Sequence, residues 1–82
     1  MDLEVELVAD PNAEDDDGLG WSVIADARDP VHVRPGVMLL AGNPQVRAVA
    51  RVVAVDDDGQ IHFSILPGSV EKNRHLLGRT VA

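Results

Sequence analysis

The clearest alternation of apolar and polar positions lies between residues 45 and 66. A run rich in β-branched residues at 46–55 is followed by three aspartates, by Gly59, and by an alternating segment at 60–65. In that segment Ile61, Phe63 and Ile65 share one face. An Asp-Gly step suits a tight reversal, because glycine has no Cβ to clash at positive φ. The pattern predicts a β-hairpin with arms at 46–55 and 60–65.

Two earlier segments also alternate with period two. Residues 3–9 place Leu3, Val5, Leu7 and Ala9 on one face and acids on the other, as in a half-buried strand. Residues 19–25 predict a second strand. Its expected inward face consists of Leu19, Trp21, Val23 and Ala25. The acidic, Pro- and Asn-containing loop at 10–18 is expected to join these two strands as a hairpin with a long tip.

The remaining segments predict short elements. Residues 26–36 form a connector in which Asp29-Pro30 suits a turn or the first turn of a short helix, and 37–41 is a short apolar strand. Ser69 is placed to cap a short helix that ends before Gly78, since its hydroxyl can accept a hydrogen bond from the first turn. Residues 79–81 are expected to add a last strand.

These elements predict an all-β fold, a small antiparallel barrel of about five strands with one short C-terminal helix. We expect an SH3-like barrel, with an OB-like barrel as the alternative. The 82 residues allow one domain, 1–82. Trp21 and Phe63 are the only aromatic residues, so the core is expected to be aliphatic. The chain has no cysteine to form a disulfide, and self-association into a homo-oligomer would help so small a domain.

Charge is distributed unevenly along the chain. Residues 1–27 contain nine acids and no Lys or Arg, whereas 28–82 contain five acids and seven Lys or Arg residues. Such asymmetry can mark a segment that faces a partner. The N-terminus lacks a basic region followed by a long apolar run, and no run approaches the roughly 18 apolar residues of a membrane helix. We therefore expect a cytoplasmic protein with no membrane association.

The chain shows no motif for catalysis, a metal or a cofactor. It lacks a nucleophile elbow, a P-loop and a dinucleotide fingerprint. His32, His62 and His75 are scattered, and none stands at ligand spacing from another histidine or a carboxylate. The acidic loop at 10–18 fails the EF-hand pattern, because Asp15 occupies the position that requires glycine. We therefore expect neither enzymatic activity nor a cofactor.

The leading hypothesis is a non-catalytic protein–protein interaction or assembly module with a polarised surface. The expected partner-binding residues are the outward charged groups Glu4, Glu6, Asp15, Asp16, Asp17, Arg47, Arg51 and His62. The alternative is a nucleic-acid-associated barrel that uses Arg34, Arg47, Arg51 and Arg79, or an acidic mimic of nucleic acid. The net charge of −7 opposes binding to phosphate, so a protein partner is favoured over nucleic acid.

Overall fold

The structure, a computed structural model, describes residues 5–10, 18–43 and 45–78. The predictions for residues 3 and 4, for most of the loop at 10–18, and for a strand at 79–81 lie outside these ranges. Within them, the strands are β1 (Leu7–Val8), β2 (Gly20–Val23), β3 (Met38–Gly42), β4 (Arg47–Val55) and β5 (Gln60–Ile65). The helical elements are α1 (Val70–Asn73) and the 3-10 turns η1 (Ile24–Asp26), η2 (Pro30–His32) and η3 (Arg74–Leu76).

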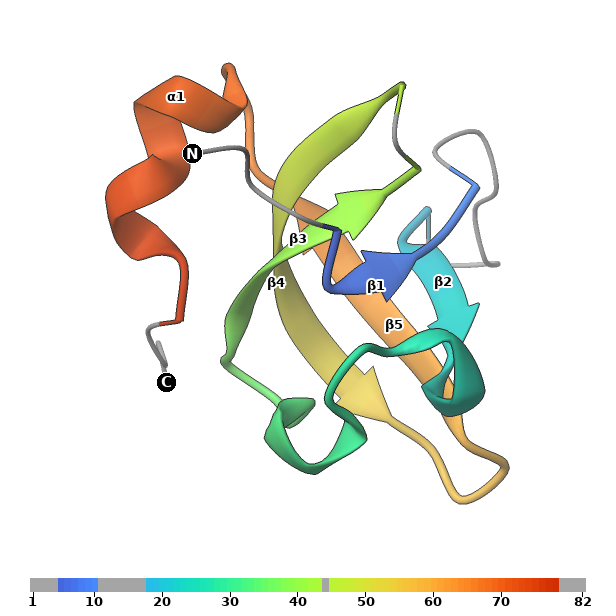
Figure 1. Cartoon of the computed structure of the whole chain (residues 1–82). Coiled ribbons are helices and arrows are strands. Elements are labelled where there is room, and N and C mark those ends of the chain that lie inside the picture. Colours follow the sequence, from blue (N-terminus) through green and yellow to red (C-terminus); the bar gives the residue numbers. More distant parts are fainter. Residues whose placement is uncertain (1–4, 11–17, 44, 79–82) are drawn as a thin grey trace.

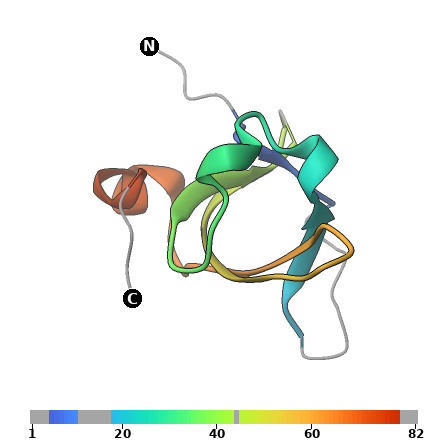
Figure 2. The same cartoon turned by 90° about the horizontal axis from the view of Figure 1, so that it is seen from below.

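The five strands form one sheet in the order β1-β3-β4-β5-β2, which curls into a nearly closed barrel (Figures 1 and 2). β1 runs parallel to β3, with Leu7 opposite Ala41, and the other strand pairs are antiparallel. The prediction of a purely antiparallel barrel is therefore wrong, because the sheet is mixed. The expected hairpin between the first two strands is also wrong, since β2 pairs with β5. Alternation defines the two faces of a strand, but it does not identify the neighbouring strand.

The central hairpin is confirmed. β4 and β5 pair in antiparallel register, with a shift between Val52 and Ala54, and Gly59 adopts a φ of 80° in the turn. The Asp56 carboxylate accepts hydrogen bonds from the backbone N–H groups of Asp58 and Gln60, each at 3.0 Å. A side chain that binds the backbone in this way stabilises the reversal locally. The turn thus depends on residues that are adjacent in sequence, which is why the pattern predicted it.

The inward face of β2 differs from the prediction. Ser22 is buried and Trp21 is 39% exposed, so Trp21 points outward. Gly20 lies opposite Phe63 of β5, and a Cβ on Gly20 would lie 2.3 Å from the Phe63 ring. The Ser22 hydroxyl donates a hydrogen bond to the Val8 carbonyl at 2.6 Å, which links β2 to β1 where the barrel closes. The small residues therefore face inward because Phe63 and the β1 backbone occupy the space there.

β3 is buried on both faces. Leu39 and Ala41 join the barrel core, which includes Leu7, Val52, Ile61 and Phe63. Met38 and Leu40 pack with Val49 in a second cluster outside the barrel. The side chains that cover this second cluster are Leu66, Val70, Leu76 and Leu77. The C-terminal helical segment lies beside β3 and β4 on the outside of the barrel (Figure 1).

The short helix begins as the sequence predicts. The Ser69 hydroxyl accepts a hydrogen bond from the Lys72 N–H at 3.2 Å, and Gly78 follows η3 with a φ of 81°. The expected turn at Asp29-Pro30 is confirmed as η2. No helix in the described residues is long and apolar enough to span a membrane. The cytoplasmic location stays a prediction.

Candidate functional site

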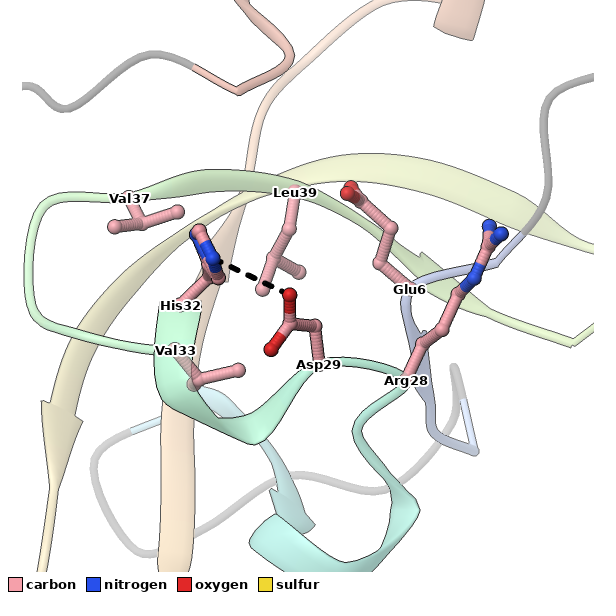
Figure 3. A pocket seen from close by; sticks show the side chains of 7 residues that line it. All are labelled: Glu6, Arg28, Asp29, His32, Val33, Val37 and Leu39. Atoms are coloured by element: carbon pink, nitrogen blue, oxygen red, sulfur yellow. Dashed lines mark ion pairs between the residues drawn. The ribbon is translucent and has the colours of Figure 1, made fainter.

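A surface pocket of about 400 Å³ lies where β1, η2 and β3 meet (Figure 3). Its volume falls within the roughly 300–1,000 Å³ typical of small-ligand sites. The lining side chains are Glu6, Arg28, Asp29, His32, Val33, Val37 and Leu39. β1 reaches this position by pairing with β3, and the backbone N–H of Arg28 donates to the Glu6 carbonyl at 2.7 Å. The pocket thus joins residues that are separated by up to 33 positions in the chain.

Each of the two carboxylates in the pocket has a defined partner. Glu6 Oε2 accepts a hydrogen bond from the Leu40 backbone N–H at 2.9 Å. Asp29 Oδ2 lies 3.3 Å from His32 Nε2, at the i,i+3 spacing that η2 provides. The Asp29 and His32 side chains are 61% and 72% exposed, so solvent screens this ion pair. Glu6 was expected to be an outward contact residue, but its carboxylate is half-buried in the pocket and bonded to β3.

The base of the pocket is apolar. Leu39 and Val33 are buried members of the barrel core, and Val37 is half-buried beside them. An aliphatic base with carboxylates above it is the chemistry of a site for a molecule with an apolar part and a polar end. The sequence prediction missed Arg28, Asp29 and His32. The spacing of Asp29 and His32 around Pro30 was a local signal of the pair, but the approach of Glu6 had none.

A second surface lies on the outside of β2, β5 and β4, and we call it the outer face. Its residues are Trp21, Arg51, Ala54, His62 and Ser64. His62 lies between Trp21 on β2 and Ala54 on β4, and Arg51 lies opposite Ser64. Val53, at the register shift, adds an exposed aliphatic side chain. A tryptophan, a histidine and an arginine therefore gather on three adjacent strands.

His62 also contacts the turn of the hairpin, with its Nε2 atom 3.4 Å from Asp56 Oδ2. No carboxylate stands at ligand spacing from His62 in the sequence, but the β-hairpin brings Asp56 to it. The pKa of Asp56 is lowered from its ordinary value. The largest cause is the hydrogen bond from the Gln60 backbone N–H, and the His62 side chain acts in the same direction, while desolvation opposes both. The ionised carboxylate is therefore the form that the folded turn favours.

This pKa shift predicts an acid-sensitive hairpin turn. Because the folded-state pKa lies below the unfolded one, the stabilisation is present above the unfolded pKa and is lost as pH falls through the folded value. We expect the Gln60 amide proton resonance to titrate with a midpoint below that of an ordinary aspartate and its exchange with solvent to accelerate there. Asp56→Asn should abolish this titration, whereas Asp57→Asn should leave it unchanged. A midpoint above that of an ordinary aspartate, measured by NMR, would contradict the prediction.

The other predicted contact residues are dispersed. Arg47 and Arg51 are exposed on the same face of β4, but the buried Val49 lies between them. Val49 is covered there by the side chains of Leu66, Val70, Leu76 and Leu77. Arg51 and His62 share the outer face, whereas Glu6 lies in the pocket. Glu4, Asp15, Asp16 and Asp17 lie outside the described residues. Of the arginines proposed for nucleic acid, Arg34 is exposed after η2 and Arg79 is also outside the described ranges.

No group of three or more His, Cys, Asp or Glu side chains in the described part of the chain is arranged to hold a metal ion. Comparison of the chain with models of protein families, with curated proteins and with solved structures gave no match. The geometry of the pocket and of the outer face is therefore the basis for inferring a function.

Proposed function

We propose that this protein is a non-catalytic interaction module, an SH3-like barrel that docks a protein partner on its outer face. The observation that carries the proposal is the outward position of Trp21, which is the only tryptophan in the chain and is 39% exposed. A large aromatic side chain on the outside of a small barrel buries much less apolar surface than it would in a core. Binding of a partner would cover it.

The composition of the outer face supports a protein partner. Tryptophan and arginine are enriched among the residues that dominate binding energy at protein interfaces. Here Trp21 and Arg51 lie on rigid, paired strands, with His62 between the strands that carry them. Ser64 and the aliphatic Val53 add polar and apolar contacts around them. Because the sheet fixes the backbone of these residues, only their side chains would have to be ordered on docking.

The pocket supports a non-catalytic role. Its lining contains no serine, threonine, cysteine or lysine, and its carboxylates Glu6 and Asp29 each already have a partner within the protein. Its Asp29–His32 pair is largely exposed to solvent, which screens the interaction between the two side chains. Binding without chemistry is the function that these groups suit best.

The proposal predicts that Trp21→Ala weakens partner binding by about 30-fold or more, as expected when a central aromatic contact of an interface is removed. Arg51→Glu should weaken binding further by reversing charge on the same face. Wild-type and variant proteins would be immobilised, and partners from native extract would be quantified by mass spectrometry. The affinity of the recovered partner would then be measured with purified protein.

Arg34→Glu is the matched control, since it reverses the same charge on an exposed residue that is not one of the outer-face residues, and it should leave binding unchanged. Analytical ultracentrifugation of the same variants tests whether the partner is a second copy of this chain. Equal capture of the same proteins by wild type, Trp21→Ala and Arg51→Glu would overturn the proposal.

Single-stranded nucleic acid is the second candidate partner of the outer face. The exposure of Trp21 on β2, on the same outer face as Arg51 of β4, favours it, because single-strand binders combine stacking aromatics with basic residues. Trp21 fluorescence provides a direct assay. Quenching by an oligonucleotide at low salt that weakens steeply as salt rises would support this candidate, and unchanged fluorescence would exclude it.

A further inference from the structure

The pocket and the outer face lie on different elements of the barrel, and the pocket has a chemistry of its own. In Figure 3 the carboxylates of Glu6 and Asp29 are both directed toward the space above Leu39, while the Arg28 guanidinium extends away from it. Two carboxylates therefore face the pocket interior across an aliphatic base. This arrangement repels anions and attracts a cation that carries an apolar part.

We infer that the pocket binds the side chain of a lysine from the protein partner, with its aliphatic stem on Val33, Val37 and Leu39 and its ammonium group between Glu6 and Asp29. The inference deepens the proposed function and rests on it, because the partner supplies the lysine. Lysine combines a flexible four-carbon stem with a compact charge that carries three hydrogen-bond donors. Its ammonium group can contact one oxygen of each carboxylate at the same time.

The hydrogen bonds of the two carboxylates favour lysine over arginine. Glu6 Oε2 already accepts from the Leu40 N–H, and Asp29 Oδ2 already faces His32. Neither carboxylate presents two unengaged oxygens to the planar fork of a guanidinium group, which binds best in a bidentate manner. An ammonium group has no such requirement. A metal ion is disfavoured because the described residues hold no suitable group of three ligands.

The test titrates ¹⁵N-labelled protein with Nα-acetyl-lysine N-methylamide. The matched probe is Nα-acetyl-norleucine N-methylamide, which keeps an unbranched aliphatic stem and lacks the ammonium group. We expect the lysine probe to shift the amide resonances of Leu39 and Leu40, since the Leu40 N–H is bonded to Glu6. It should bind about tenfold more tightly than the norleucine probe, as for hydrogen bonds to charged groups, and more tightly than the arginine analogue.

Glu6→Gln is the informative variant. The amide oxygen of glutamine can still accept the Leu40 N–H, so the contact between β1 and β3 is kept while the charge is lost. We expect this variant to weaken binding of the lysine probe about tenfold. Asp29→Asn should have a similar effect. Glu71→Gln, the same substitution on an exposed residue of α1, should have none.

Several outcomes would overturn the inference: equal binding of the lysine and norleucine probes, tighter binding of the arginine analogue, shifts confined to residues away from the pocket, or no effect of Glu6→Gln. The proposed function can be contradicted independently of this inference. If Trp21→Ala and Arg51→Glu do not affect the partner while the lysine probe still binds the pocket, only the docking role of the outer face is wrong.

Discussion

Phe63→Ala is expected to destabilise the folded state by about 3–5 kcal/mol, the usual cost of deleting a fully buried phenylalanine. Phe63 is 1% exposed and is among the largest fully buried side chains of the protein. It lies opposite Gly20 on one side and Val52 on the other, so it fills the space between β2 and β4. A domain of 82 residues has a total stability of about 4–12 kcal/mol, so this single change removes a large part of it.

Urea denaturation followed by circular dichroism measures this loss. Ile65→Ala is the control on the same strand, because Ile65 is 45% exposed and its truncation should cost about 1 kcal/mol or less. Phe63→Leu keeps most of the side-chain volume, so its loss of stability should lie between those of Ile65→Ala and Phe63→Ala. The assignment of Phe63 as the central core residue would be wrong if Ile65→Ala and Phe63→Ala cost the same.

The parts of the fold that the sequence predicted correctly are local. The β4–β5 hairpin depends on alternation within each arm and on Asp56 and Gly59 in the turn, all within 20 residues. The C-terminal helix depends on Ser69 and on the three residues that follow it. In both cases the residues that determine the element also form its hydrogen bonds. A pattern read along the chain therefore contains the necessary information.

The parts that the sequence did not predict depend on distant partners. The parallel pairing of β1 with β3 joins Leu7 to Ala41 across 34 positions, and nothing in either segment identifies the other. The pocket depends on this pairing, because it brings Glu6 to the Leu40 N–H and to the side of η2. The candidate site was missed for the same reason as the sheet order. Its residues become neighbours only after the barrel closes.

Trp21 shows how hydrophobicity alone can assign the wrong face. Alternation in 19–25 is equally consistent with Trp21 or with Gly20 and Ser22 facing inward. Hydrophobicity alone favours the larger apolar residue for the core, but Phe63 from another strand already fills that space. Two small residues flanking a large one were the available signal. A strand that packs closely against a bulky neighbour requires small inward residues.

Gly20→Ala tests this account of β2. A Cβ at residue 20 would lie 2.3 Å from the Phe63 ring, closer than packed atoms approach, so β2 or the ring must move. We expect a loss of about 1–3 kcal/mol, the usual cost of overpacking a core. The displacement should also alter the environment of the adjacent Trp21, which would appear as a change in its fluorescence emission maximum.

The double variant Gly20→Ala/Phe63→Leu isolates the cause of that loss. Leucine lacks the ring atoms that the new methyl group would meet, so the cost of Gly20→Ala should fall by at least half in the Phe63→Leu background. Equal costs in the two backgrounds, measured by urea denaturation, would mean that alanine at residue 20 acts on the backbone of β2 and not on Phe63. The outward position of Trp21 would then need another explanation. If the costs differ as expected, the contact between Gly20 and Phe63 is what directs Trp21 to the outer face, and the core and the proposed docking surface are determined by the same packing constraint.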